Sequence, residues 1–302
     1  MAYPTPQVTN TTAAVFIPEI WSDEVIAAYK ANLVAANLFK KMSFKGKKGD
    51  TIHIPKPTRG EASLKASETA VTLIADKEDE VIVLIDKHYE YSRFIEDITE
   101  VQALSSMRRF YTDDAGYALA KQVDTDMVQL GRVMNGGTDD NTYDAGYTGA
   151  DGVALYDGSN AAALTDIAIR NMIQKLDDQD VPTSGRFFLI PPAARNTLMG
   201  LDRYTAMDFV GEAASANTIR NGQIGNLYGI PVYVTSNADT TASGDRVCLL
   251  GHKDAAVLVE QLNVRSQTQY KQDYLSTLYT SDTIYGVKEL REDSAFALVV
   301  PA

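Results

Sequence analysis

Cysteine is nearly absent from this chain of 302 residues, in which Cys248 is the only one. A single cysteine cannot form a disulfide within its own chain, so a fold held together by internal disulfides is excluded. Cys248 lies in the apolar run of residues 247–250 (VCLL), which predicts an inert thiol in the core.

Long apolar runs are also missing. No segment approaches the roughly 20 apolar residues that a membrane-spanning helix requires. Residues 1–16 (MAYPTPQVTNTTAAVF) lack the charged and apolar regions of a secretory signal. We therefore expect a soluble protein that has no membrane partner and is made in a reducing cytoplasm.

Basic side chains are in the minority, because 28 Lys and Arg residues face 40 Asp and Glu residues, for a formal net charge of -12. An acidic surface repels phosphate at long range. Tight, sequence-specific binding of nucleic acid is therefore not expected.

Sequence motifs that are typical of enzyme active sites are missing as well. The sequence has no glycine-rich phosphate loop and no G-x-S-x-G nucleophile turn. The histidines do not have metal-ligand spacing, and the acidic loop after residue 138 lacks the alternation of a calcium loop. The histidines are His53, His88 and His252, and the carboxylates of the acidic loop are Asp139, Asp140, Asp144 and Asp151. We expect neither an enzyme nor a cofactor or metal; an acidic hydrolase is the alternative if carboxylates cluster in space.

The most informative segment that is present covers residues 46–135, and its first half predicts a two-stranded ribbon. Residues 51–54 (TIHI) form a short strand that is expected to stop at Pro55 and Pro57, because proline confines a strand to an edge. Residues 80–95 predict one long second strand, with Val81, Val83 and Ile85 on one face. An isolated hairpin is marginally stable in water, so either the core of the same chain or a neighbouring molecule must cover it.

The second half of this segment predicts one very long helix. Residues 99–102 (TEVQ) match a capping box, and apolar residues recur at helical spacing as far as Met134. The helix is expected to end at residues 135–137 (NGG), after roughly 50 Å. Elements of this kind cannot bury their own apolar surface, which indicates a self-assembling structural protein.

Charge is unevenly distributed over the ribbon segment. Residues 40–59 are basic apart from Asp50, and residues 76–100 are dominated by acids. The two segments are either solvated faces of opposite sign or complementary patches that meet between subunits. The predicted inter-subunit contact residues are Lys45, Lys47, Lys48, Lys56, Arg59, Glu78, Asp79, Glu80, Glu96 and Asp97.

The rest of the chain predicts a mixed α+β fold in which helices and strands are interleaved. Residues 1–15 predict a flexible arm. The expected helices cover residues 22–39, 164–177 and 191–198, and a polar loop covers residues 136–158. The expected strands cover residues 186–190, 230–234 and 246–250, and residues 257–300 are mostly strand with a turn near Tyr285 and Gly286.

In this order of segments, the chain resembles phage major capsid proteins of the Hong Kong 97 type. The resemblance covers nearly the whole length. It rests on the entry to the arm at residues 17–21 (IPEIW), the ribbon and the long helix. It also rests on residues 225–237 (GNLYGIPVYVTSN) and on residues 285–298 (YGVKELREDSAFAL).

The resemblance implies an α+β capsid fold with four parts. These are an N-terminal arm with a short helix (1–46), an extended β-hairpin loop (47–96), a peripheral domain with a spine helix (97–184 and 251–302) and an axial domain (185–250). It also implies that the extended loop lies across the adjacent subunit.

The implied function is that of a major capsid protein. Its copies would assemble in the host cytoplasm into hexamers and pentamers of an icosahedral virion shell around double-stranded DNA, with only weak, non-specific contact to that DNA. A portal and a separate scaffolding protein are the implied partners, and decoration proteins are left open. The alternative is an encapsulin-like bacterial compartment shell on the same fold.

Overall fold

The computed structural model describes the larger part of the chain. The described residues are 34–44, 49–57, 60, 62–65, 67–71, 73, 78–96, 106–132, 142–144, 156, 161–201 and 225–302. The predicted arm, most of the helix expected over 22–39, the capping box at 99–102 and most of the loop 136–158 lie outside these residues.

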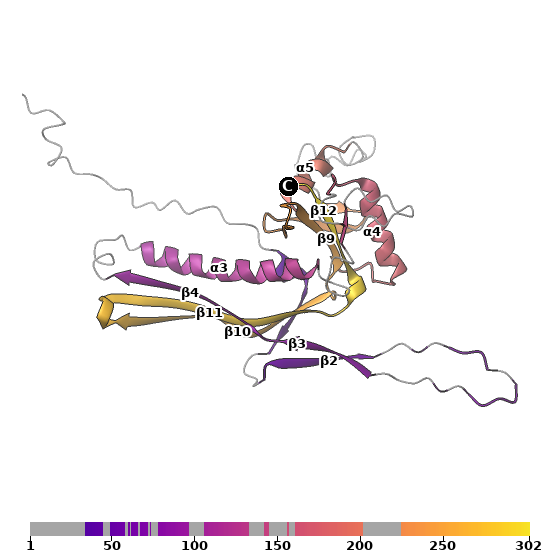
Figure 1. Ribbon diagram of the computed structural model, residues 1–302, viewed down its shortest axis with the longest axis horizontal. Coiled ribbons are helices and arrows are strands. Elements are labelled where there is room, and N and C mark those ends of the chain that lie inside the picture. The colour runs from indigo at the N-terminus through magenta and orange to yellow at the C-terminus, as the bar shows by residue number, and fades with distance from the viewer. Residues whose placement is uncertain are drawn as a thin grey trace, which may run out of the picture.

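Helices and strands combine into an α+β fold with two larger sheets and a separate ribbon (Figure 1). The six-stranded sheet has the order β5-β12-β9-β6-β8-β7 and the four-stranded sheet has the order β1-β10-β11-β4. The ribbon consists of β2 and β3. The predicted α+β class is therefore confirmed.

The six-stranded sheet has helices on both faces, because its central strands are mostly apolar and buried. Every residue of β6 and β12 is buried. Met172 of α4 packs with Phe188 on one face, and Met127 of the long helix α3 packs with Leu189 on the other. The elements of this unit are β5 (Thr142–Asp144), α4 (Asp166–Asp178), β6 (Arg186–Ile190), α5 (Pro192–Met199), β7 (Asn226–Leu227), β8 (Ile230–Val234), β9 (Arg246–His252) and β12 (Ala295–Val300).

Local signals set the boundaries in this unit much as the sequence predicts. The Thr165 hydroxyl accepts a hydrogen bond from the Ala168 N–H at 3.2 Å, which caps the first turn of α4. Proline at the start of α5 suits the first turn of a helix. The predicted strands 186–190 and 230–234 are confirmed residue for residue, and β9 runs two residues beyond the predicted 246–250.

The four-stranded sheet is long and narrow, and α3 lies along it (Figure 1). Two long antiparallel strands, β10 and β11, form its centre, and the turn between them ends at Leu275, which is in the left-handed conformation (φ 45°). Strand β4 pairs with β11, whereas β1 pairs only with the first part of β10. The bounds are α1 (Ala35–Leu38), β1 (Lys40–Ser43), β4 (Lys87–Glu96), α3 (Ser106–Leu130), β10 (Ala256–Lys271), η3 (Gln272–Tyr274), β11 (Ser276–Glu289) and η4 (Glu292–Ser294).

The long helix is shorter at its C-terminal end than predicted. Helix α3 ends at Leu130 rather than near Met134, and its 25 residues correspond to about 37 Å. Gly131 and Arg132 instead form a turn, in which the Gly131 N–H donates to the Val128 carbonyl at 3.1 Å. A Cβ at Gly131 would lie 2.5 Å from Cδ1 of Leu249, so this turn requires a close approach of the backbone to β9.

The ribbon extends further along its first strand than predicted. Strand β2 (Thr51–Pro57) pairs with β3 (Glu78–Leu84) through both prolines, instead of stopping at Pro55. Pro55 and Pro57 are two residues apart, so both ring nitrogens face the same side of the strand, where no ladder hydrogen bond is lost. The predicted edge position of β2 is confirmed within the described residues.

The second strand of the ribbon is not one strand but two. The predicted run 80–95 divides into β3 and β4, and the Ile85 N–H donates to the Asp50 carbonyl at 2.8 Å between them. At this point the chain crosses β11. A Cβ at the buried Gly286 would overlap the carbonyl oxygen of Leu84.

This crossing also explains why the turn predicted near Tyr285 and Gly286 is wrong. Strand β11 continues through both residues, and the glycine serves a close approach of two backbones rather than a turn. Beside the crossing, Val83 and Ile85 pack on Val257 and Val259 of β10. The base of the ribbon is thus covered by the chain's own four-stranded sheet. The second half of the predicted strand, β4, is itself a strand of that sheet.

We predict opposite effects for alanine at two glycines. Gly286→Ala should lower the free energy of unfolding by about 1–3 kcal/mol, because the crossing strands must separate. Gly116→Ala lies in α3, where a Cβ meets nothing within 4 Å, and should raise this free energy by about 0.5–1 kcal/mol. Denaturant unfolding followed by circular dichroism measures both, and wild-type stability of Gly286→Ala would contradict the tight crossing.

Candidate assembly surfaces

The predicted contact residues are only partly within the described chain. Lys56, Glu80 and Glu96 are exposed. Glu78 and Asp79 belong to β3, where the structure describes their backbone. The remaining residues, Lys45, Lys47, Lys48, Arg59 and Asp97, lie outside the described residues.

The basic and acidic segments face each other within one ribbon. The register of β2 and β3 places Lys56 opposite Asp79, and His53 Nδ1 lies 3.0 Å from the Glu80 carboxylate. Both members of the His53 pair are more than half exposed, so the pair contributes at most about 1 kcal/mol. Glu96 lies elsewhere, at the far end of β4 opposite Ser276. Pairing of these charges between subunits stays a prediction.

The ribbon presents apolar side chains to solvent on its outer face. Ile82 and Leu84 point outward and are 42% and 53% exposed, whereas Val83 between them is fully buried. The loop beyond the ribbon adds Leu64, Val71 and Leu73, all strongly exposed. We define Ile82 and Leu84 as the outer ribbon face. Exposed apolar side chains that lie together in this way make the outer ribbon face a candidate interaction surface.

Sequence reasoning selected the charges of the ribbon and missed this outer face. The signal was the unbroken run of residues 81–84 (VIVL), in which both faces of the strand are apolar. A strand that is covered on both faces has such a run, whereas a strand with one solvated face alternates.

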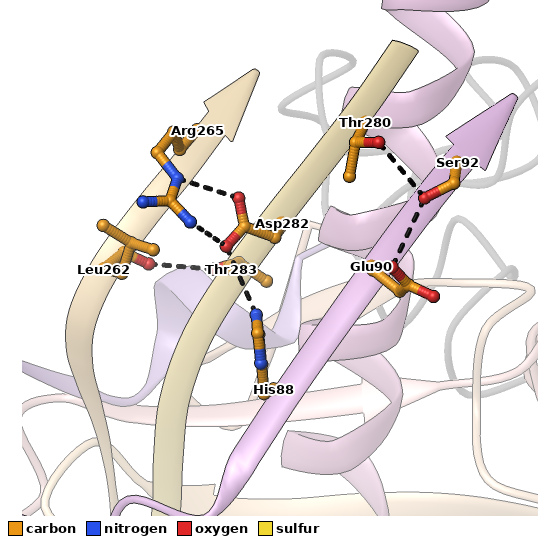
Figure 2. A network of polar contacts seen from close by, with 8 residues as sticks. All are labelled: His88, Glu90, Ser92, Leu262, Arg265, Thr280, Asp282 and Thr283. Carbon is orange, nitrogen blue, oxygen red and sulfur yellow. Dashed lines mark hydrogen bonds and ion pairs between the residues drawn. The ribbon is translucent and has the colours of Figure 1, made fainter. Parts of the chain in front are cut away.

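A polar network crosses the four-stranded sheet on the face opposite α3 (Figure 2). Arg265 of β10 donates through Nε and Nη2 to the two carboxylate oxygens of Asp282 on β11, at 3.0 and 2.7 Å. His88 Nε2 on β4 lies 3.2 Å from the same carboxylate. The Arg265 guanidinium lowers the pKa of the Asp282 carboxyl below its usual range. The network holds three neighbouring strands in register.

The other polar contacts in Figure 2 support the same strands. The Ser92 hydroxyl lies 3.3 Å from the Glu90 carboxylate and 3.4 Å from the Thr280 hydroxyl. The Thr283 hydroxyl donates to the Leu262 carbonyl at 3.0 Å, where the register of β10 shifts. These contacts join side chains of β4, β10 and β11 to one another within the sheet.

On the opposite face, α3 is joined to the sheet by two of its carboxylates, the buried Asp126 and the partly exposed Asp114. The Tyr285 hydroxyl donates to Asp126 at 2.7 Å, and Lys87 Nζ lies 2.8 Å from the same carboxylate. Burial, and then the adjacent Asp126, raise the pKa of Tyr285, so its hydroxyl remains a donor. Towards the distal end of the sheet, the Tyr91 hydroxyl donates to Asp114 at 3.0 Å.

Helix α3 is also joined to the six-stranded unit. Asp124 is fully buried and accepts hydrogen bonds from the Ala36 N–H at 3.1 Å and from Asn237 Nδ2 at 3.0 Å. One turn beyond the helix, Arg132 Nε lies 3.2 Å from the Asp239 carboxylate. One helix therefore connects the segment before β1, the turn after β8 and both sheets.

The described residues contain neither a metal-binding cluster nor a membrane-spanning helix. This part of the chain contains no group of three or more His, Cys, Asp or Glu side chains placed to hold a metal ion. It also contains no helix that combines the length and apolarity needed to cross a membrane. Cys248 is fully buried, and burial raises the pKa of its thiol, which confirms the predicted core thiol.

Comparison with known proteins identifies a family for this fold. The sequence model of a family described as phage capsid protein matches residues 95–297. This range includes α3, α4 and α5 and both larger sheets, except β1, most of β4 and the second half of β12. No protein in the curated set matches the sequence.

Solved structures match over nearly the whole chain. A chain of Mycobacterium phage Che8 is 26% identical, with a TM-score of 0.75 over 94% of this chain and 97% of that one. A chain of the capsid of cyanophage P-SCSP1u is 20% identical, with a TM-score of 0.71 over 99% of each chain. A chain of the mature capsid of bacteriophage PhiM1 is 14% identical, with a TM-score of 0.67 over 94% and 92%.

The Asp282 network predicts a pH-dependent stability. Because the folded-state pKa of Asp282 is lowered, its carboxylate stabilises the fold above the unfolded pKa of about 4 and loses this effect as the pH falls through the folded pKa. The melting temperature of wild type should exceed that of Asp282→Asn at pH 7, and the difference should shrink as the pH falls below the unfolded pKa of about 4.

Thermal unfolding of both proteins across this pH range measures the effect. Asp273→Asn, at an exposed position in the hairpin turn, removes the same charge outside the network and is the matched control. A difference for Asp282→Asn that stays constant with pH would contradict the ionic role.

Proposed function

Because this chain belongs to the phage capsid protein family, we propose that it is a major capsid protein whose copies form the hexamers and pentamers of an icosahedral shell. The observation that carries this proposal is the family match over residues 95–297. The match covers the long helix and the greater part of both sheets, so it concerns the body of the subunit.

The shape of the subunit supports assembly as the function. The ribbon extends away from the body in Figure 1, and its outer face presents Ile82 and Leu84 to solvent. An adjacent copy of the chain is the surface that covers this face in the proposed shell. Lys56 and Glu80 on the same ribbon are exposed, and in this arrangement they set the register between copies more than the affinity.

The charge of the chain suits a container for nucleic acid. A formal net charge of -12 gives a wall that encloses double-stranded DNA with only weak, non-specific contact. We propose that the shell assembles in the host cytoplasm and becomes the virion capsid. A portal and a separate scaffolding protein are proposed partners, and decoration proteins are left open.

The family match favours this function over an encapsulin-like compartment shell. A phage capsid protein and a compartment shell protein would share this fold and the outer ribbon face. Both functions require assembly into a shell, and assembly is what the following experiment tests. The nucleic acid or cargo recovered from purified shells then separates the two.

We predict that Ile82→Asp abolishes shell formation without unfolding the chain. The substitution places a charge on a half-exposed side chain that the proposed neighbour covers, where an unpaired buried charge is unfavourable. Ile167→Asp on α4 is the matched control, because both isoleucines are 42% exposed.

Size-exclusion chromatography and negative-stain electron microscopy measure assembly, and circular dichroism measures folding. Wild type and Ile167→Asp should give closed shells, whereas folded Ile82→Asp should stay in small species. Shells of wild-type yield from Ile82→Asp would remove the outer ribbon face from the interface. A wild-type chain that stays monomeric at high concentration would contradict the proposed function.

A further inference from the structure

The four-stranded sheet has an open edge on each side within the described chain. Strand β4 forms one edge, and no described strand lies beyond it. On the other side, β1 covers β10 only opposite residues 257–260. The register of β10 with β11 shifts on both sides of Leu262 and is regular again from Arg265 to Lys271. Residues 265–271 therefore form the second open edge, along which the ladder is undisturbed.

Charged side chains stand at the same two levels on both edges. Glu90 of β4 and Arg265 of β10 lie opposite the same residue of β11, and so do Glu96 of β4 and Lys271 of β10. Directly opposed residues share one face of a sheet. At each level an acid thus stands on one outer strand and a base on the other. The strand between them keeps the two backbones about 10 Å apart.

Contacts within one copy leave these charges accessible from the sides of the sheet. Arg265 holds Asp282 through Nε and Nη2, and the remaining nitrogen, Nη1, points away from that carboxylate in Figure 2. A guanidinium has five N–H groups, so Nη1 can donate to a further carboxylate. His88 also faces Asp282. Glu96 is exposed at the end of β4, and Lys271 is partly exposed at the end of β10.

Each edge carries charge of essentially one sign on this face. Residues 261–271 of β10 contain no acid. The two strong bases of β4 are turned to the other face, where they contact α3. Lys87 Nζ lies 2.8 Å from the Asp126 carboxylate, and the Arg93 guanidinium lies over the Tyr111 ring at 4.8 Å. On the polar face of Figure 2, the edge of β4 is therefore acidic and that of β10 is basic.

Each edge repels a second edge of its own kind and attracts one of the other kind. Two β10 edges side by side would set bases against bases, and two β4 edges would set acids against acids, which is unfavourable. A β4 edge beside a β10 edge sets acids against bases. Both strands are antiparallel to β11 and hence parallel to each other. A second copy in the same orientation therefore brings both charge pairs together without a shift along the strands.

We propose that the β4 edge of one copy docks beside residues 265–271 of a second copy, with Glu90 against Arg265 and Glu96 against Lys271. Each copy then offers one edge to the neighbour on either side. Such a head-to-tail contact closes into a ring when the rotation between copies permits it. The inference rests on the proposed function, because rings of five and six copies are the units of the proposed shell.

Reversal of one charge tests the contact, because it sets two like charges against each other at every junction. Glu96→Lys and Lys271→Glu should each raise the lowest protein concentration that gives shells about fivefold, the upper range for an exposed pair. Asp178→Lys, at an exposed position near the end of α4, is the matched control and should assemble like wild type. Sizing and electron microscopy measure assembly, and circular dichroism confirms folding.

Combining the two reversals separates a contact between copies from an effect within one copy. The double variant restores opposite charges at every junction and should form closed shells at the wild-type concentration. In a mixture of the two single variants, unlike copies attract and like copies repel. An alternating ring closes with six copies, whereas five leave one junction between like charges. The mixture should therefore give six-membered rings and flat or tubular products instead of closed shells.

The outcomes distinguish this inference from the proposed function. A mixture that assembles no better than either single variant would place the effect within one copy and overturn the edge contact. Single variants that form shells at the wild-type concentration would overturn it as well, and both results leave the proposed function standing. A wild-type chain that never forms shells overturns both.

Discussion

The contact of α3 with both sheets is the constraint on which the rest of the structure depends. Met127 and Val128 belong to one apolar cluster with Phe187 and Leu189 of the six-stranded sheet and with Leu258 of the four-stranded sheet. Apolar packing alone has little directional preference. The orientation of the two sheets is instead specified by the carboxylates on the same helix turns.

Those carboxylates are unusual in their burial. Asp124 is fully buried and Asp126 is nearly so, and their partners come from four separate segments of the chain. A buried carboxylate is tolerated only when its hydrogen bonds are satisfied, so each partner must occupy one position. The helix thus converts a non-directional apolar contact into a defined arrangement of the two sheets.

The sequence predicted best where local signals decide the structure. Strands 186–190 and 230–234 are apolar runs bounded by glycine or proline, and Thr165 stands at the start of α4. The errors share another cause, which is contact between segments far apart in the chain. The end of α3 depends on Gly131 against Leu249, and the break after β3 depends on Gly286 beneath Leu84. The network at Asp282 was likewise beyond local reasoning, because His88 lies 194 residues away in sequence.

The crossing at Gly286 has a mechanical consequence. The described ribbon meets the body where two backbones touch at Gly286 without a side chain between them, beside the packing of Val83 and Ile85 on β10. This close contact fixes where the ribbon leaves the body, and the ladder between β10 and β11 continues through it. The proposed shell has vertices with five and with six neighbours, which differ in curvature, so the ribbon must meet its neighbours at more than one angle. The contact at Gly286 sets the origin of the ribbon in every copy, whatever that angle is.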